Sequence, residues 1–260
     1  MTSGAQRACS SSHCERSPGG SPSRGSASPG GSPSPKAWLL DALGTLLELE
    51  PPVEPLRREL RERFGLELSA AEVGAAMKAE IGWYRANHDI ARDRASLALL
   101  RRGAAEVLRD ALPPAAHPLE LDALTAALLA ALRFRPFAEV PAALRAARAA
   151  GIRLVVVSNW DVSLHDALDA AGLTPLLDGV VTSAELGAAK PDGRIFARGL
   201  ELAGVAAAEA LHVGDDLAAD VGGARAAGID VRLVLRDGEP APPGVAVVRS
   251  LAELPGVAAP

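Results

Sequence analysis

The sequence predicts an α/β fold, in which a doubly wound parallel sheet carries a large helical insertion. Short leucine-rich and β-branched runs alternate with helical stretches through the second half of the chain, a pattern typical of parallel sheets covered by helices. The first such run, at residues 37–40, is separated from the others by residues 51–134, where the periodicity is helical and no strand pattern occurs. Several runs end in polar residues, as expected where parallel strands meet a ligand.

Composition divides the chain into two parts. The chain has 260 residues, and residues 1–36 are mostly Ser, Gly and Pro, which predicts a disordered tail. This tail lacks the apolar core of a secretory signal peptide. Both cysteines, Cys9 and Cys14, lie in it, so the rest of the chain has no disulfide framework. This cysteine usage favours a cytoplasmic location.

Charge and hydropathy restrict the partners. The formal net charge is −5, and the tail is net basic, so the rest of the chain is acidic. An acidic fold without a basic stripe argues against nucleic acid or an anionic membrane as the main partner. No apolar run is long enough to span a bilayer. We therefore expect no nucleic acid and no membrane among the partners, while the sequence leaves the oligomeric state open.

The first predicted strand is an apolar run that ends in the acid Asp41. A carboxylate among leucines is costly unless it is paired, so Asp41 suggests a metal ligand or a nucleophile. The alternative is an Asp that caps a turn before Gly44. In the insertion that follows, Ser69 and Glu72 have the spacing of a capping box. The helices expected in the insertion cover residues 53–64, 70–84, 94–112 and 121–132.

Beyond residue 135 the pattern changes to strands that alternate with helices, several of which end at a glycine. Because crossovers between parallel strands are right-handed, the carboxyl ends of all strands should lie along one edge of the sheet. The expected strands cover residues 152–157, 179–182, 210–213, 231–235 and 245–248. The expected helices cover residues 139–150, 163–171, 192–203 and 217–227.

Polar side chains gather at these predicted strand ends and in one loop. A carboxylate, a hydroxyl, a cation and further carboxylates are the groups that phosphoryl transfer to a nucleophile needs. Each alone also has a structural interpretation, such as a helix cap or a solvated loop residue. Several converging acids would repel one another strongly without a divalent cation and a lysine. The residues concerned are Asp41, Ser158, Asn159, Lys190, Asp215, Asp216 and Asp220.

Four motifs contain these residues. They are Asp41-Ala42-Leu43-Gly44-Thr45-Leu46, Ser158-Asn159, Lys190-Pro191-Asp192, and His212-Val213-Gly214-Asp215 with Asp220. In these motifs and their order the chain resembles the haloacid dehalogenase superfamily, in the branch with a helical cap inserted after the first motif. The resemblance implies a Rossmann-like core formed by residues 37–50 and 135–260, with the cap formed by residues 51–134.

The resemblance also implies roles for these residues. Asp41 would attack the substrate and form an aspartyl ester, Ser158 would bind the transferring phosphoryl group, and Lys190 would neutralise charge. The cofactor would be Mg²⁺ and the substrate a small phosphate ester, with Thr45 and Asn159 among the substrate-binding residues. The implied magnesium ligands are Asp41, the backbone carbonyl of Leu43, Asp215, and either Asp216 or Asp220, between which the sequence does not decide.

One position departs from the pattern of the family's phosphatases. They carry a second Asp two residues after the nucleophile, which protonates the leaving oxygen and later activates water, and here that residue is Leu43. General acid–base catalysis is typically worth ~10²- to 10⁴-fold.

Three interpretations follow from this departure. The first is a phosphohydrolase of weak or specialised activity, which the retained Lys190 and Asp215 favour. The second is a catalytically impaired binding or regulatory protein, which Leu43 favours. The third is a 2-haloacid dehalogenase type of enzyme, whose halide leaving group needs no proton. The Gly-Asp-Asp cluster counts against the third, because metal-independent dehalogenases do not need it.

Residues near the end of the second predicted helix are candidates to face the site. Among them, Arg85 and His88 would suit an anionic substrate. The alternative, which the sequence slightly favours, is that Trp83 and Tyr84 pack in the core of the cap and that Arg85 and His88 are solvated. His212, within a predicted strand, is expected to pair with a neighbour in the core.

Overall fold

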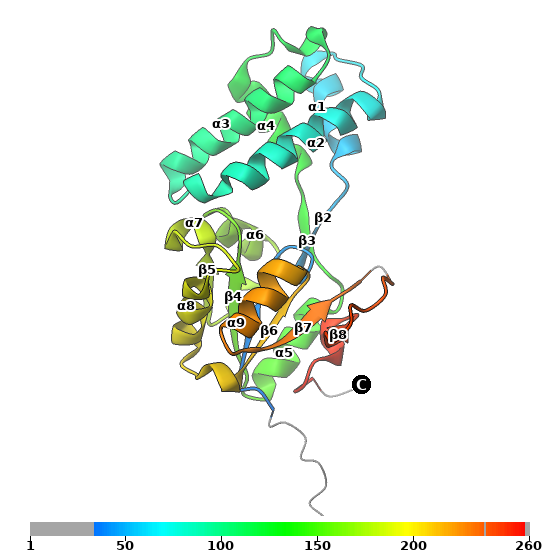
Figure 1. Cartoon of the computed structure of the whole chain (residues 1–260). Coiled ribbons are helices and arrows are strands. Elements are labelled where there is room, and N and C mark those ends of the chain that lie inside the picture. Colours follow the sequence, from blue (N-terminus) through cyan, green and yellow to red (C-terminus); the bar gives the residue numbers. More distant parts are fainter. Residues whose placement is uncertain (1–33, 237, 258–260) are drawn as a thin grey trace, which may run out of the picture. The chain divides into compact units, whose positions relative to one another are not determined.

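The centre of the fold is a six-stranded parallel sheet with the strand order β5-β4-β1-β6-β7-β8 (Figure 1). The structure, a computed structural model, describes residues 34–236 and 238–257. Nearly all of the predicted tail, including Cys9 and Cys14, therefore lies outside the described residues. The strands of the sheet are β1 (Ala37–Leu40), β4 (Arg153–Ser158), β5 (Gly179–Thr182), β6 (Ala210–Gly214), β7 (Asp230–Val234) and β8 (Val247–Val248).

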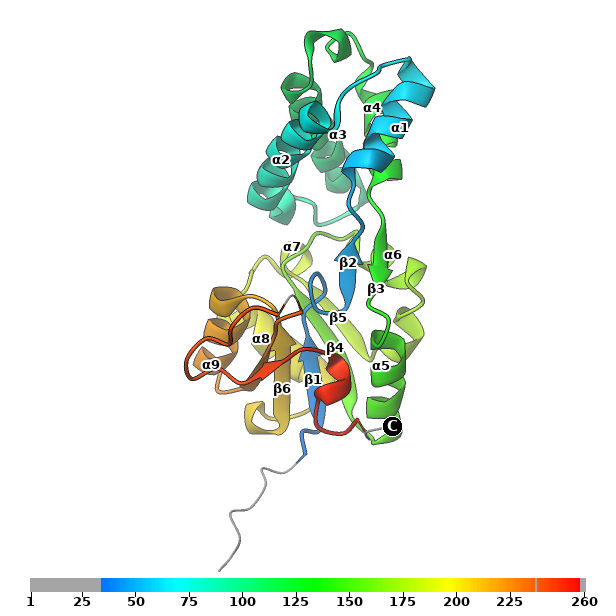
Figure 2. The same ribbon diagram turned by 90° about the vertical axis from the view of Figure 1, so that its right-hand side faces the viewer.

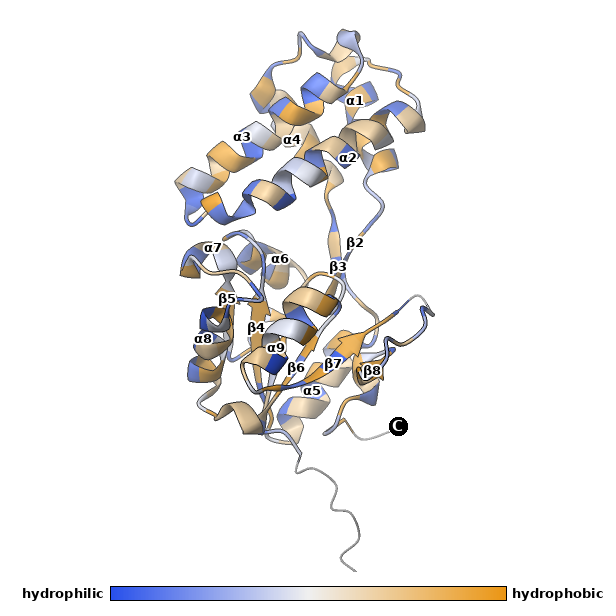
Figure 3. Cartoon of the chain, in the orientation of Figure 1, coloured by the Kyte–Doolittle hydropathy of each residue, from blue (hydrophilic) through white to orange (hydrophobic). Residues whose placement is uncertain are grey.

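Helices cover both faces of this sheet, because the side chains of each strand point alternately into two apolar clusters. On β1, Trp38 and Leu40 belong to the cluster that includes α5 and α6, whereas Leu39 belongs to the cluster that includes α8 and α9. Figure 3 shows β4, β6 and β7 in hydrophobic colours, as expected for strands buried on both faces. The predicted doubly wound parallel sheet is confirmed. The helices are α5 (Val140–Ala149), α6 (Leu164–Ala170), α7 (Ser183–Leu186), α8 (Gly193–Ala203) and α9 (Gly223–Ala226).

Between β1 and β4 the chain forms a helical segment, α1 to α4, which it enters along β2 and leaves along β3 (Figures 1 and 2). The strands β2 and β3 pair antiparallel, and Glu48 of β2 forms an ion pair of 3.0 Å with Arg135 of β3. The helices bury an apolar cluster of their own, which includes Leu56, Leu60 and Leu108. The elements are β2 (Leu47–Leu49), α1 (Val53–Phe64), α2 (Ala70–Asn87), α3 (Arg94–Ala111), α4 (Leu121–Ala131) and β3 (Phe134–Pro136).

Local signals in the sequence place most of these elements correctly. Ser69 caps α2 and forms the predicted capping box with Glu72. Gly65 ends α1 in the left-handed region, at φ +69°. The strands β2 and β3 were not predicted, because three residues each are too few to show a period.

The helix predicted over residues 217–227 is present, but its first half is not an α-helix. There the structure has a π-helix, because the Asp216 carbonyl accepts hydrogen bonds from the backbone N–H groups of both Asp220 and Val221. No helix among the described residues combines the length and apolar character needed to cross a membrane. The remaining short elements are η1 (His88–Ile90), η2 (Pro114–Ala116), η3 (Thr174–Leu176), η4 (Ala207–Glu209), η5 (the π-helix, Leu217–Gly222) and η6 (Leu251–Glu253).

Candidate functional site

Three neighbouring strands bring the predicted catalytic residues together. Asp41 follows β1, Ser158 ends β4 and Asp215 follows β6, and β4 and β6 flank β1 in the sheet. Because the carboxyl ends of parallel strands lie along one edge, these residues converge. Lys190, from the loop between α7 and α8, reaches the same point, with its Nζ 2.6 Å from Asp41 Oδ1. The structure thus gathers these residues, and their roles stay predictions.

The Asp41 carboxylate is held through one of its oxygens. Oδ1 accepts a hydrogen bond of 2.9 Å from Ser158 Oγ and one of 2.6 Å from Lys190 Nζ. All three side chains are buried. Within the described part of the chain, no side chain donates a hydrogen bond to Oδ2. The second oxygen is therefore available to a ligand.

Three acids form a cluster beside this contact. Asp41, Asp215 and Asp220 each place a carboxylate oxygen within 4.8 Å of the others. Two glycines make room for them: a Cβ at Gly44, where φ is +80°, would lie 2.1 Å from Asp215 Oδ2, and one at Gly214 would lie 2.2 Å from Asp220 Cγ. Hard divalent cations prefer carboxylate oxygens, so this donor set fits Mg²⁺.

Lys190 offsets part of the negative charge of the cluster. Its Nζ also lies 2.6 Å from Asp220 Oδ1. Burial alone would lower the pKa of Lys190, but the charges of Asp41 and Asp220 outweigh burial and raise this pKa above its ordinary value. Burial, followed by the charges of Asp41 and Asp220, raises the pKa of Asp215 to about 7. One lysine therefore does not neutralise three acids, and Asp215 bears the remaining repulsion.

The structure distinguishes the two acids between which the sequence left the metal role open. Asp220 is buried and its Oδ1 lies 2.8 Å from His212 Nε2, which confirms the expected pairing of His212 in the core. Burial opposes ionisation of Asp220, but Lys190 and His212 hold its pKa well below the usual range. The Asp216 carboxylate is exposed and instead accepts 2.7 Å hydrogen bonds from the N–H groups of the next helical turn. The geometry therefore favours Asp220, and not Asp216, as the acid beside a metal. Asp216 caps the helix that follows it.

Asn159 and Thr45, both predicted to bind substrate, have different surroundings. The Asn159 amide holds the backbone of Lys190: its Oδ1 accepts from the Lys190 N–H at 2.6 Å, and its Nδ2 donates to the Lys190 carbonyl at 3.0 Å. Asn159 thereby positions the lysine. The Thr45 hydroxyl is fully buried and has no hydrogen-bond partner among the described residues. Substrate binding stays a prediction for both.

A cavity of about 790 Å³ lies between the strand ends and the helical segment. Leu43, two residues after Asp41, lines it and is 37% exposed. Trp160 also lines it and packs edge-on against Phe134, with 5.0 Å between the ring centroids. Mostly apolar walls with a few polar groups are typical of sites for small organic ligands. The helical segment contributes Ile81, Leu97, Leu100, Ala104, Leu128, Leu129 and Leu132.

Polar contacts cross from the helical segment to the loop after β4 and to α6, around this cavity. The Tyr84 hydroxyl donates a 2.7 Å hydrogen bond to Asp161 Oδ2. Burial, followed by the charge of Asp161, raises the pKa of Tyr84, so the hydroxyl stays a donor. Arg94 forms an ion pair with Asp166, with 2.7 Å between Nη2 and Oδ1. The sequence analysis favoured a Tyr84 that only packs in the core of the helical segment. The hydrogen bond to Asp161 shows that Tyr84 also contacts the loop after β4.

The other residues at the end of α2 divide between the two interpretations offered from the sequence. Trp83 packs against the apolar cluster of the helical segment, as expected. Arg85 is exposed and also lines the cavity. Its position is therefore consistent with both predictions, that of a solvated residue and that of a residue facing the site. His88 lines the cavity, its side chain is 14% exposed and its Nε2 lies 3.2 Å from Asp89 Oδ1, so the prediction of a solvated His88 is wrong.

Glu80 is a residue of the cavity wall that sequence patterns did not single out. Its side chain is 3% exposed, and it forms no hydrogen bond or ion pair with another side chain of the described residues. Burial raises the pKa of Glu80 to about 7. The signal was present in the helical period, because Glu80 follows Ala76 and Met77 by four and three residues on the buried face of α2.

Glu80→Gln is expected to raise the melting temperature, and to raise it more at about pH 8 than at about pH 5. The folded protein keeps a proton on Glu80 up to about 7, whereas the unfolded chain releases it near 4.5, so stability falls as the pH rises between these values. Glutamine has no charge to bury and escapes this loss, which is about 1–3 kcal/mol. Thermal unfolding of both proteins at the two pH values measures it. Equal shifts at both would contradict the expectation.

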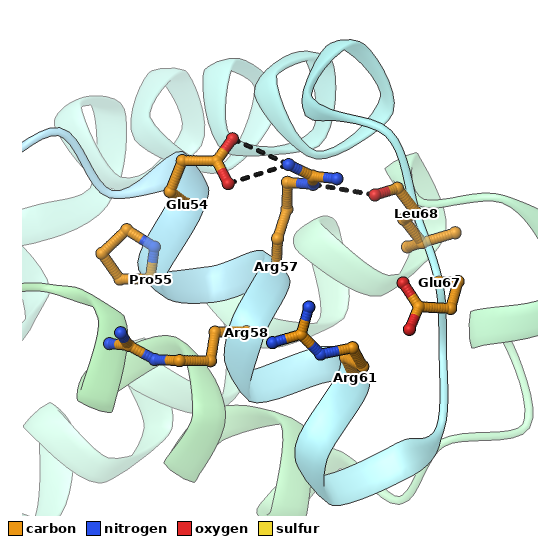
Figure 4. Close-up of a pocket in the computed structure, with 7 residues that line it drawn as sticks. All are labelled: Glu54, Pro55, Arg57, Arg58, Arg61, Glu67 and Leu68. Atoms are coloured by element: carbon orange, nitrogen blue, oxygen red, sulfur yellow. Dashed lines mark hydrogen bonds and ion pairs between the residues drawn. The ribbon is translucent and has the colours of Figure 1, made fainter.

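A second and smaller pocket lies on the surface of α1 and the loop that follows it (Figure 4). Its Arg57 is already engaged, since Nη1 donates to Glu54 and Nε donates to the Leu68 carbonyl, each at 2.8 Å. None of the predicted site residues lines this pocket. It is therefore not part of the candidate site.

The fold and the residues at the strand ends define the class of protein, and a family model described as haloacid dehalogenase-like hydrolase matches residues 35–228. The chain belongs to this family of hydrolases. It is 34% identical over 215 residues to Haloacid dehalogenase-like hydrolase domain-containing protein 3 of Bos taurus, and the match covers 79% of this chain and 83% of that protein.

Two further comparisons concern proteins named as phosphatases. The chain is 37% identical over 130 residues to Phosphatase MT3486 of Mycobacterium tuberculosis, covering 48% of this chain and 59% of that protein. It superimposes with a TM-score of 0.57 and 25% identity on the crystal structure of an HAD phosphatase from Thermococcus onnurineus, covering 84% of this chain and 95% of that one. The family and the fold class expected from the sequence are thus confirmed.

Proposed function

We propose that the chain is a Mg²⁺-dependent phosphohydrolase that moves a phosphoryl group from a small phosphate ester to Asp41 and then to water. The observation that carries the proposal is the contact of Asp41 Oδ1 with both Ser158 and Lys190, beside the acids Asp215 and Asp220. The two relatives named as phosphatases support it. The cysteine-free folded part favours a cytoplasmic location for this activity.

In this reaction Asp41 attacks phosphorus through Oδ2, forming a P–O bond while the ester P–O bond to the leaving alcohol breaks. Ser158 Oγ and Lys190 Nζ, which already hold Oδ1, are placed to donate to the phosphoryl oxygens. Water then attacks the aspartyl phosphate, which releases inorganic phosphate and restores Asp41. Asn159 keeps Lys190 in place through both backbone hydrogen bonds.

Mg²⁺, when bound, would supply positive charge that offsets the phosphoryl oxygens. The residues proposed to hold it are Asp41, Asp215 and the backbone carbonyl of Leu43, with Asp220 beside them. The helical segment would act as the cap of this family and select the substrate, since it forms much of the cavity wall. Arg85, His88 and Thr45 stay candidates for substrate contacts.

Hydrolysis of para-nitrophenyl phosphate with and without EDTA tests the proposal. This leaving group needs little protonation, so the missing acid at position 43 does not limit the assay. We expect turnover that EDTA abolishes and that added Mg²⁺ restores. Mg²⁺ binding without turnover would favour the binding or regulatory protein, for which the apolar and exposed Leu43 is the specific observation. If the protein shows no turnover and does not bind Mg²⁺, the next test is hydrolysis of a 2-haloacid.

Stabilisation of the protein by Mg²⁺ is expected to grow with pH. Because Asp215 keeps its proton up to about 7 instead of 3.8, the folded chain loses stability as the pH rises through this range, and Mg²⁺ binding relieves the repulsion that causes this loss. The melting temperature should therefore rise more on adding Mg²⁺ at about pH 8 than at about pH 5. Asp215→Asn should lose most of the Mg²⁺ shift and its pH dependence. A pH-independent shift in the unsubstituted protein would contradict the assignment of Asp215.

A further inference from the structure

The acids that line the large cavity differ in how their charge is satisfied. Asp161 accepts hydrogen bonds from the Tyr84 hydroxyl at 2.7 Å and from the Ser163 N–H at 2.6 Å. Asp166 is paired with an arginine of α3. Glu80 has no such partner among the described residues, although it is buried more deeply than Asp166. Glu50 also lines the cavity, but it is only half-buried and lies 3.8 Å from Arg135. Glu80 is therefore the fully buried acid of this cavity without a partner among the described residues.

The cations of the same cavity do not remove this difference. Arg85 and Arg133 are exposed, and Arg101 is half-buried. None of them lies within ion-pair distance of Glu80. Burying an uncompensated carboxylate is costly, and a buried acid beside an empty volume suits a ligand that brings its own positive charge.

We propose that Glu80 is a specificity-determining residue that binds an ammonium group on the alcohol part of the substrate. The inference rests on the proposed phosphohydrolase function. It assigns the substrate to phosphate monoesters whose alcohol carries an apolar body and, at the end remote from the phosphate, a primary amine. Glu80 accepts hydrogen bonds from the ammonium in the complex and takes no part in bond breaking.

The lining of the cavity supports this assignment. It includes Asn159, which directly follows Ser158, and Leu43, which lies two residues after Asp41. The walls between are apolar side chains such as Leu97, and Glu80 belongs to the α2 side. A substrate with its phosphate at the strand ends would therefore have apolar walls for its body and the Glu80 carboxylate, contributed by α2, for a cationic group.

Binding of two phenols that differ in one amine tests the inference without any catalysis. Tyramine and para-ethylphenol have the same aromatic body, and only tyramine carries an ammonium. Calorimetric titration of the full chain with Mg²⁺ present should show tyramine binding about 10- to 100-fold more tightly. Glu80→Gln should remove this preference and leave the affinity for para-ethylphenol unchanged. Glu106→Gln, on an exposed glutamate of α3, is the matched control and should keep the preference.

Three results would overturn the inference. The first is equal binding of the two phenols by the unsubstituted protein. The second is a preference that survives Glu80→Gln. A preference for tyramine that appears only after Arg101→Gln would also overturn it, because Arg101 would then be the internal partner of Glu80 in solution.

A kinetic arm separates this inference from the proposed function. The phosphate esters of the two phenols have the same type of leaving group, so their kcat values should be similar while the KM of the tyramine ester is about tenfold or more lower. Glu80→Gln should raise that KM to the value of the para-ethylphenol ester, whereas the control Glu106→Gln should leave both KM values unchanged. Loss of all hydrolysis with intact tyramine binding would contradict the proposed function alone. Normal hydrolysis with equal KM values would contradict the role of Glu80 alone.

Discussion

Asp41→Asn is expected to reduce hydrolysis of para-nitrophenyl phosphate by ~10³-fold or more. An amide oxygen does not form the acyl phosphate through which the proposed reaction passes, and no other carboxylate of the described residues has the same two contacts. Asp215 and Asp220 lie within 4.8 Å but belong to the proposed metal side of the cluster. Single-turnover assays on the purified variant, with its folding checked by circular dichroism, measure the loss.

The matched control is Asp122→Asn, which removes an exposed carboxylate from α4 and should keep full activity. The amide oxygen that Asp41→Asn introduces can still accept hydrogen bonds from Ser158 and Lys190, so the substitution should leave the local structure intact. Unchanged turnover in Asp41→Asn would remove Asp41 from the role of nucleophile. It would also leave the close contact with Lys190 as a structural ion pair.

Sequence patterns predicted the sheet well because its central strands β1, β4 and β6 are buried on both faces and end abruptly. The edge strand Gly179 to Thr182, which is only partly buried, also has the predicted bounds. The site residues could be predicted because parallel strands deliver their carboxyl ends to one edge, so that Asp41 and Ser158 meet although 117 positions separate them. Lys190 lies on a loop, where the sequence has no hydrophobic periodicity, so it was predicted as a site residue from the order of the four motifs.

Residues whose surroundings depend on tertiary contacts were not predicted. Glu80 lies on the apolar face of α2, but a glutamate at such a position can still reach solvent, and the packing of α2 against the other helices shows that it is buried. Asp161 follows a motif directly, but its role depends on Tyr84, 77 positions away. The difference between Asp216 and Asp220 likewise depends on the π-helix. Asp216 caps this helix, whereas Asp220, one turn later, contacts Lys190.

Leu43→Asp is expected to raise the hydrolysis of alkyl phosphates by ~10²- to 10⁴-fold, because it restores a general acid and base two residues after the nucleophile. Leu43 is 37% exposed and lines the cavity, so the smaller Asp side chain fits without displacing the core. The backbone carbonyl that is proposed to bind Mg²⁺ stays in place. Steady-state kinetics on a primary alkyl phosphate, at saturating Mg²⁺, measure the gain.

The choice of leaving group makes this prediction specific. Para-nitrophenolate departs without a proton, so Leu43→Asp should change hydrolysis of its phosphate ester far less than that of an alkyl phosphate. Leu43→Asn has nearly the same shape and no transferable proton, and it should show no gain on either substrate. An equal gain in both variants would mean that removing the leucine, and not adding an acid, relieves the limit. No gain in a folded, Mg²⁺-binding Leu43→Asp protein would mean that another step limits turnover, with opening of the contacts between Tyr84 and Asp161 the next to measure.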